Sequence, residues 1–198
     1  QAQEQLVYSA LHDALTHLPN RTLLMERLEM ALQRAKRYPD HLFAILFIDL
    51  DRFKAINDSL GHQVRDRLLL AIAHQLQELV RSTDTVARLG GDEFIILLDP
   101  IQDINDAIRV ADRLHAQLRV PLQLAGREVF TSASIGIAAS ATHYQHGADL
   151  LRDADIAMYR AKEKGKARYE IFDRAMYAQA IQKLQIENDL RQAVIRQE

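Results

Sequence analysis

Two acidic residues stand beside apolar runs in a pattern that suits metal-dependent chemistry. Asp49 follows the apolar run 42–48, and Asp92 follows two glycines and precedes the apolar run 94–98. If these runs are neighbouring strands, the two carboxylates converge at one edge of a sheet. Carboxylate oxygens suit Mg²⁺, which completes its shell with waters and substrate phosphates, and such ions can activate an attacking oxygen and stabilise a leaving one. Acids at strand ends are also common as plain solvated turn residues, so the pattern alone leaves both interpretations open.

Alternating helices and strands must position these acids. The run 42–48 has the continuous apolar character of a strand that is covered on both faces. Asn20 is a suitable cap for an amphipathic helix that extends to about Arg37, and the polar segment 57–61 is expected to lie outside any helix. Further helices are expected at 4–12, 62–80, 103–118, 148–164 and 173–196, and further strands at 85–89, 94–98, 120–124, 128–139 and 168–172. This mixed order predicts an α+β fold in which helices pack on a sheet with a central antiparallel hairpin.

Composition excludes several other classes of function. The chain has 198 residues, a formal net charge of -2 and no cysteine. The charge gives no indication of a surface for a nucleic acid polymer, and the lack of cysteine excludes disulfides, thiol catalysis and cysteine-ligated zinc. The longest apolar run is too short to span a bilayer, and the first residues do not form a signal peptide. We expect a cytoplasmic domain without direct membrane contact, although a longer parent chain could be attached to a membrane.

Several separated motifs then point to one family. The segment 49–66, DLDRFKAINDSLGHQVRD, and the segment 88–94, RLGGDEF, together resemble the GGDEF domain of diguanylate cyclases. The resemblance begins at 13–21, DALTHLPNR, and continues to 154–162, ADIAMYRAK, so it covers nearly the whole chain. It implies a ferredoxin-like core close to the palm of polymerases and adenylyl cyclases. The implied activity is the condensation of two GTP into cyclic di-GMP, with release of pyrophosphate.

The resemblance also implies a metal site and a catalytic acid. Asp49 and Asp92 match the metal-binding carboxylates, and the carbonyl of Leu50 matches a further oxygen ligand. The implied ion is Mg²⁺, with Mn²⁺ as an alternative. Asp92 also matches the acid assigned as the base for the attacking 3′-hydroxyl. Glu93 receives no role, because alternation along a strand would point it away from Asp92.

Substrate contacts are implied at positions on both sides of the GGDEF motif. Guanine recognition falls to Asn57 and Asp66, whose amide and carboxylate groups can bond the edge of the base. The other matching positions are His62, the backbone amides around Arg52 and Phe53, and the basic side chains Lys162 and Lys166. Taken without the resemblance, His62 and Asp66 are more typical of a helix cap and a solvated acid, and Lys162 and Lys166 are more typical of a solvated basic helix end.

Two positions depart from the family pattern. Arg65 stands where the family typically has glycine, which would distort the guanine site if the position needs a positive φ and would be harmless in the first turn of a helix. Lys166 stands where the family usually has arginine. Lysine keeps the charge but loses the planar fork that binds phosphate through two hydrogen bonds.

A product-binding site is implied directly before the GGDEF motif. Arg81 and Asp84 form the RxxD pattern of the family's inhibitory site, where they would bind cyclic di-GMP, and Arg109 or Arg113 is a weaker candidate for a further contact. The same pair could instead form a surface ion pair of little energetic weight.

The implied mechanism requires two domains. Each would present one GTP, so we expect a homodimer to be needed for catalysis, because positioning of both reactants is the main catalytic contribution. We assign residues 1–12 to a linker helix, 13–173 to the GGDEF domain, and 174–198 to a helix that leads into an EAL phosphodiesterase domain. The alternative function is a catalytically weak or inactive module that binds GTP or cyclic di-GMP and regulates an attached phosphodiesterase.

Overall fold

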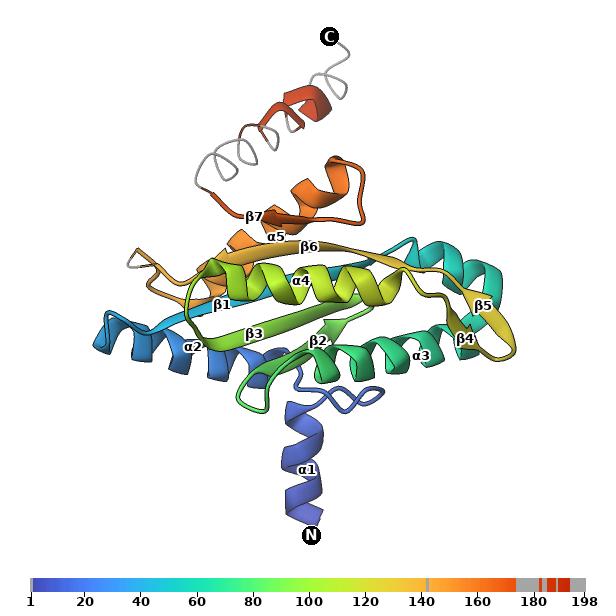
Figure 1. Ribbon diagram of the computed structural model, residues 1–198, viewed down its shortest axis with the longest axis horizontal. Helices are drawn as coiled ribbons and strands as arrows, with labels where there is room; N and C mark the ends of the chain where they lie inside the picture. The colour runs from blue at the N-terminus through green and yellow to red at the C-terminus, as the bar shows by residue number, and fades with distance from the viewer. Residues whose placement is uncertain (1, 142, 174–181, 183–184, 188, 193–198) are drawn as a thin grey trace.

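The computed structural model describes residues 2–141, 143–173, 182, 185–187 and 189–192. Within these residues, a five-stranded sheet has the order β2-β3-β1-β6-β7, and β4 and β5 form a separate hairpin (Figure 1). The strands are β1 (Leu42–Asp51), β2 (Thr85–Gly90), β3 (Glu93–Ile101), β4 (Leu122–Leu124), β5 (Arg127–Val129), β6 (Ser132–Ala139) and β7 (Tyr169–Ile171). The helices are α1 (Ala2–Leu11), α2 (Arg21–Arg37), α3 (Phe53–Leu79), α4 (Ile104–Leu118) and α5 (Gly147–Glu163).

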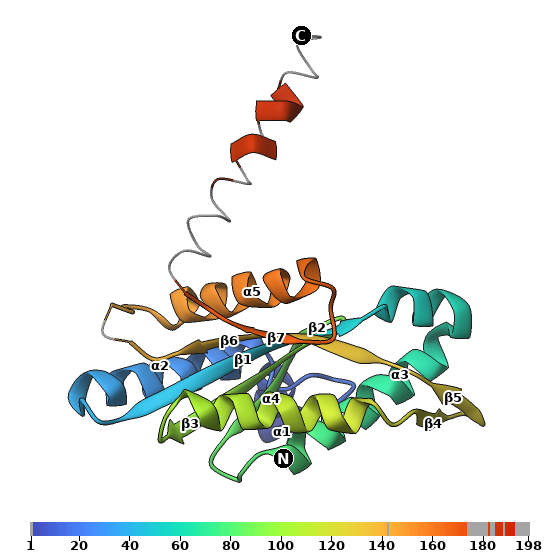
Figure 2. The same ribbon diagram turned by 45° about the horizontal axis from the view of Figure 1, so that its top comes forward.

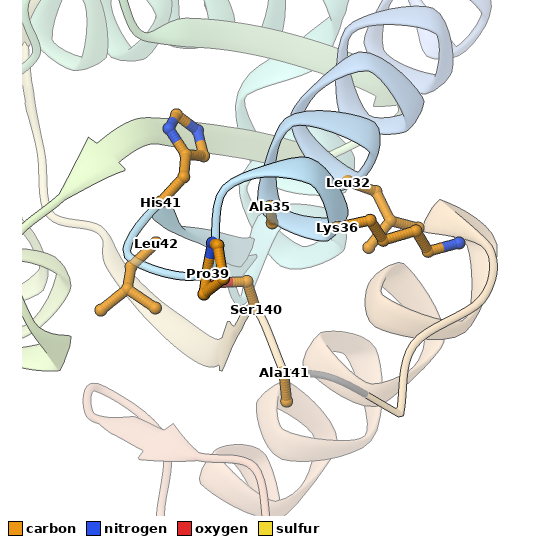
Figure 3. A pocket seen from close by; sticks show the side chains of 8 residues that line it. All are labelled: Leu32, Ala35, Lys36, Pro39, His41, Leu42, Ser140 and Ala141. Carbon is orange, nitrogen blue, oxygen red and sulfur yellow. The ribbon is translucent and has the colours of Figure 1, made fainter.

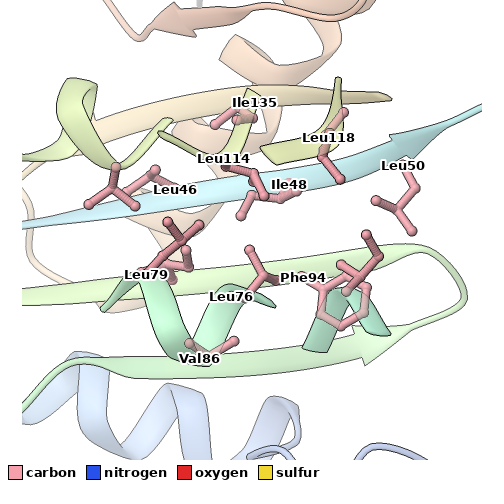
Figure 4. Packing of buried hydrophobic residues seen from close by; sticks show 14 of the residues in the cluster. Leu46, Ile48, Leu50, Leu76, Leu79, Val86, Phe94, Leu114, Leu118 and Ile135 are labelled. Atoms are coloured by element: carbon pink, nitrogen blue, oxygen red, sulfur yellow. The ribbon is translucent and has the colours of Figure 1, made fainter. Parts of the chain in front are cut away.

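Strand β1 forms the centre of the sheet and is buried on both faces, as its apolar run predicts. It pairs antiparallel with β3 and with β6. Its even-numbered side chains, such as Leu46 and Ile48, join the core cluster under α3 and α4 (Figure 4). Its odd-numbered side chains, such as Ile45 and Phe47, join the cluster under α2 and α5. Helices therefore cover both faces of the sheet, with α5 on one side and α4 on the other (Figure 2).

Local capping sets the starts of two predicted helices. The Asn20 side chain accepts a hydrogen bond from the backbone N–H of Leu23 at the start of α2, and Asp103 does the same for Asn105 at the start of α4. Such caps satisfy backbone donors that have no partner inside the helix. Helix α1 projects away from the sheet (Figure 1), and no described helix combines the length and apolarity needed to cross a membrane.

Three expectations about the elements need correction. Helix α3 begins at Phe53 rather than near residue 62, and the segment expected to be non-helical forms its first turns up to a break at Gly61, where φ is 81°. Phe53, Ile56 and Leu60 pack against the core, and this burial outweighs the turn preference of the polar residues between them. The expected strand 128–139 is two strands, because β5 pairs with β4 and only β6 joins the main sheet. The expected helix 173–196 does not begin at Asp173.

The C-terminal linker assigned to 174–198 lies largely outside the described residues. Its described positions, 182, 185–187 and 189–192, are helical and exposed.

Candidate active site

The pairing of β1 with β3 brings the two predicted metal carboxylates to one edge of the sheet. The register ends with Asp49 opposite Glu93, and the backbone N–H of Leu50 donates to the carbonyl of Asp92 at 3.2 Å. The turn between β2 and β3 is built on Gly90 and Gly91, whose φ angles of 141° and 51° favour glycine. The strand that carries Asp49 therefore pairs with the strand that Asp92 directly precedes, as the proposed metal site requires.

Asp49 is buried and already binds a cationic side chain. Its carboxylate is 2.9 Å from Nζ of Lys162 at the end of α5, and only 6% of the residue is exposed. Burial raises the pKa of Asp49, and the negative charges of Asp92 and Asp51 raise it further, while Lys162 opposes them. The site thus concentrates negative charge in a poorly solvated place, which favours binding of a cation.

The donor set is compatible with a magnesium ion but is small. Within the described part of the chain, no three carboxylate, imidazole or thiol groups are arranged to hold a metal. Asp49 and Asp92 with one backbone carbonyl would supply part of an octahedral shell, and Mg²⁺ usually takes the remaining ligands from waters and substrate phosphates. The ion pair between Asp49 and Lys162 shows that this carboxylate accommodates a positive charge.

Glu93 and Asp155 are acidic neighbours to which the sequence analysis gave no role. Because Glu93 lies directly opposite Asp49 in an antiparallel pair, both side chains lie on the face covered by α5. Burial raises the pKa of Glu93, and the charges of Asp155, Asp49 and Asp92 raise it further. The pairing register was the signal that could have placed Glu93, and α5 brings Asp155 to it from a distant part of the sequence.

The start of α3 holds the predicted guanine reader Asn57. Arg52 precedes the helix in a left-handed conformation with φ of 59°, and Phe53 begins the helix. The side-chain oxygen of Asn57 is buried and has no hydrogen-bond partner among the described residues. A buried polar atom without a partner costs free energy, so this oxygen is suited to receive a donor from a ligand.

The structure answers the question raised by Arg65. Arg65 has a helical backbone, since Gly61 is the position in α3 with non-helical angles. Its guanidinium donates to Asp66 through Nε at 2.9 Å and Nη2 at 2.7 Å. Arg65 therefore leaves the helical backbone intact but pairs with Asp66, the second predicted guanine contact. His62 in the same helix is exposed.

Lys166 lies in a left-handed turn after α5. Gly165, Lys166 and Ala167 have φ angles of 114°, 64° and 49°. The turn leads into β7, and Lys162 precedes it in the last turn of α5. The two predicted phosphate contacts are thus presented by a helix end and by the turn that follows it.

The RxxD residues line a separate hollow of about 170 Å³, together with Arg109 and Arg113 of α4. The carboxylate of Asp84 accepts hydrogen bonds from the backbone N–H groups of Arg81, at 2.9 Å, and Asp99, at 3.2 Å. Asp84 therefore fixes the loop, and Arg81 lines the hollow together with the two arginines of α4.

Another hollow, of about 290 Å³, lies beside the beginning of β1 (Figure 3). Its lining includes Leu32, Lys36, His41 and Ser140. None of the predicted site residues lines it, and it lies at the end of β1 opposite to Asp49.

An ion pair ties the N-terminal motif to the GGDEF turn. Arg88, which is 9% exposed, donates through Nη1 to both carboxylate oxygens of Asp13, at 2.9 and 3.0 Å. The same guanidinium donates through Nη2 to the carbonyl of Gly91 at 2.8 Å. Thr16 also donates to Asp13. The conformation of the turn before Asp92 thus depends on Asp13, two residues beyond the end of α1.

Residues 10–168 match the profile of the diguanylate cyclase GGDEF domain. The chain belongs to this family. The chain is 46% identical over its whole length to the bifunctional diguanylate cyclase/cyclic di-GMP phosphodiesterase MucR of Pseudomonas aeruginosa, of which it spans 28%. It is 48% identical over 81% of its length to the diguanylate cyclase TpbB of the same organism, of which it spans 37%.

Solved structures agree with the fold of this GGDEF domain. The isolated GGDEF domain of TpbB superposes with a TM-score of 0.82 at 44% identity, covering 86% of this chain and 99% of that one. A microbial GGDEF domain described in an interaction with cyclic di-GMP superposes with a TM-score of 0.71 at 28% identity, covering 84% of this chain and 99% of that one. The α+β fold predicted from the sequence is confirmed.

Proposed function

We propose that this GGDEF domain condenses two molecules of GTP into cyclic di-GMP. The observation that carries the proposal is the edge of the sheet where Asp49, paired with Lys162, lies beside the backbone of Asp92. Buried carboxylates with an adjacent ammonium group suit the binding of a metal-complexed triphosphate. The diguanylate cyclases among the relatives support the same activity.

Asp49, Asp92 and the carbonyl of Leu50 would hold Mg²⁺ or Mn²⁺. When bound, the ion would polarise the reacting phosphate and neutralise the charge of the pyrophosphate leaving group. Lys162, which pairs with Asp49 in the present structure, would turn to the phosphates of GTP. Lys166 and the backbone amides of Arg52 and Phe53 would bind the outer phosphates.

Asp92 would act as the base. It accepts the proton of a 3′-hydroxyl, whose oxygen forms a bond to the α-phosphorus of the other GTP while the bond from that phosphorus to the bridging oxygen breaks. One pyrophosphate leaves at each of the two condensations. Since one domain holds one GTP, two copies of the chain must face each other, and turnover should rise more steeply than the protein concentration.

Guanine would bind at the beginning of α3. The unpartnered oxygen of Asn57 accepts from the base, and the carboxylate of Asp66 accepts from the N1 and N2 hydrogens. His62 contacts the nucleotide from the same helix. Because Arg65 already donates to Asp66, guanine must either displace the guanidinium of Arg65 or share the carboxylate of Asp66 with it.

The test is a product assay. The chain is incubated with GTP and Mg²⁺ at several protein concentrations, and the products are separated chromatographically. We expect cyclic di-GMP and pyrophosphate from the unaltered chain and none from Asp92→Ala. Formation of no cyclic di-GMP by a chain that binds GTP would contradict the proposal.

The pairing of Arg65 with Asp66 favours a second candidate function. In it the domain binds GTP without condensing it and regulates an attached phosphodiesterase, to which residues 174–198 would lead. The relative MucR is described as a bifunctional diguanylate cyclase and cyclic di-GMP phosphodiesterase, which is consistent with such an arrangement. GTP binding without product, together with a GTP-dependent change in the activity of the attached domain, would support this second function.

We also propose that the RxxD hollow binds the product. The guanidinium of Arg81, together with Arg109 and Arg113, can bond phosphate or the guanine edge. Asp84 would position Arg81 through the loop that it fixes and could accept from guanine with its remaining lone pairs. The related domain described with cyclic di-GMP is consistent with product binding by this fold.

A further inference from the structure

Asp51 is a buried carboxylate that the proposed mechanism leaves without a role. It is the last residue of β1 and is 4% exposed. Because side chains alternate along a strand, Asp51 lies on the same face as Asp49, the face covered by α5. Burial of an ionised group is costly unless hydrogen bonds compensate it, so its partners indicate what it does.

Three donors from two distant segments converge on this carboxylate. The hydroxyl of Ser132 donates to Oδ2 at 2.6 Å, and the hydroxyl of Ser134 donates to Oδ1 at 2.7 Å. Both serines belong to β6, which pairs with β1. The third donor is the backbone N–H of Ala167, at 3.1 Å from Oδ2. Asp51 therefore links the central strands to the turn that follows α5.

That turn has a backbone that requires support. Lys166 and Ala167 are consecutive non-glycine residues with positive φ, a conformation that L-residues adopt at a cost in free energy. The backbone N–H of Lys166 donates to the carbonyl of Ala161 at 3.0 Å, and the next N–H donates to Asp51. Both left-handed residues are exposed, so side-chain packing does not hold them in place.

We propose that Asp51 is a positioning residue that holds Lys166 in place for the phosphates of GTP. Lys162 is attached to β1 through Asp49, and the turn carrying Lys166 is attached through Asp51, two residues further along the same strand. Asp51 thus ties the turn of Lys166 to the same strand whose Asp49 pairs with Lys162. This inference rests on the proposed function, because it assumes that Lys166 contacts bound GTP.

A double-mutant cycle tests the inference. The affinity for the methylene analogue of GTP that cannot be cleaved between the α- and β-phosphates is measured by calorimetry with Mg²⁺. The chains compared are the unaltered one, Asp51→Ala, Lys166→Ala and the double variant. We expect each single substitution to weaken binding about tenfold, and the double substitution to weaken it no further, since Asp51 acts through Lys166.

Two controls separate positioning from a general loss of structure. Ser134→Ala removes one hydrogen bond of Asp51 but leaves the contact with Ala167, so the affinity should stay within about twofold of the unaltered chain. Asp51→Asn, which keeps an acceptor for the amide, should restore most of the affinity. If Asp51→Ala does not fold, Asp51→Ser replaces it in the cycle, because the shorter side chain keeps a polar group for the serines without reaching the amide.

The outcomes distinguish this inference from the function on which it rests. Effects of Asp51→Ala and Lys166→Ala that multiply in the double variant would overturn the positioning role, and so would unaltered affinity in either single variant. Failure of the unaltered chain to bind the analogue at all would instead overturn the proposed GTP site.

Discussion

The contact between α5 and β6 leaves no room for a side chain at Gly136. A Cβ atom at this position would lie 1.9 Å from the carbonyl oxygen of Ala154 and 2.2 Å from the backbone nitrogen of Met158. Both obstacles are backbone atoms of α5, so no side-chain rotation can relieve the clash. Gly136→Ala therefore requires α5 to move away from the sheet.

The size of that movement follows from the distances. Ordinary van der Waals contact begins near 3.4 Å, so the oxygen at 1.9 Å must move by about 1.5 Å. Helix α5 buries Leu150, Leu151, Ala154, Ala157 and Met158, and the displacement would loosen their packing. Overpacking of a core typically costs about 1 to 3 kcal/mol, and we expect about 3 kcal/mol because only backbone can yield.

Urea denaturation followed by circular dichroism measures this loss. In a separate thermal denaturation of a chain of this length, a loss of about 3 kcal/mol corresponds to a fall in Tm of about 6 to 12 °C. Gly126→Ala is the matched control, because its Cβ meets no atom within 4 Å and only its φ of +74° is unfavourable, a cost of about 1 kcal/mol. A free energy of unfolding of Gly136→Ala within 1 kcal/mol of the unaltered chain would refute the steric argument.

Three further predictions concern charged groups. Burial raises the pKa of the Asp49 carboxyl above 3.8, so the folded chain binds the carboxyl proton more tightly than the unfolded chain and loses stability as the pH rises above 3.8. In urea titrations with a chelator present, the stability of Asp49→Asn relative to the unaltered chain should therefore increase from pH 4 to 7. A constant difference in stability over this range would contradict the argument. Arg88→Lys cannot hold both Asp13 and the carbonyl of Gly91, and should cost about 2 kcal/mol in denaturant titrations; an unchanged midpoint would count against the bridge. Arg81→Ala should weaken cyclic di-GMP binding at least tenfold by calorimetry while early GTP turnover persists, and unchanged affinity would show that the RxxD hollow is not the product site.

Patterns within short segments predicted much of the fold. The apolar run of β1 and the cap of α2 depend on neighbouring residues, and the structure has them where the sequence placed them. The predicted start of α3 was wrong. Residues 57–59 favour turns in isolation, whereas their apolar neighbours pack on a core formed by distant strands. Local preference could not weigh that burial.

Contacts between distant segments explain what the sequence did not predict about the site. The convergence of Asp49 and Asp92 was predicted on the condition that their strands pair, and they do. The partners of Asp51 lie 81 to 116 residues away along the chain, and no spacing rule connects them. Glu93 received no role because alternation was considered relative to Asp92 in the turn, and its position opposite Asp49 depends on the pairing of two strands.

The departure at Arg65 changes the charge of the proposed guanine site rather than its backbone. Its backbone is helical, so a glycine is not needed for conformation at this position. Its guanidinium instead occupies the carboxylate of Asp66, although both side chains remain partly exposed. Ion pairs with such exposure contribute little free energy, so guanine can compete for Asp66 at small cost. Arg65 is therefore expected to reduce GTP affinity only modestly, and the product assay decides between the two candidate functions.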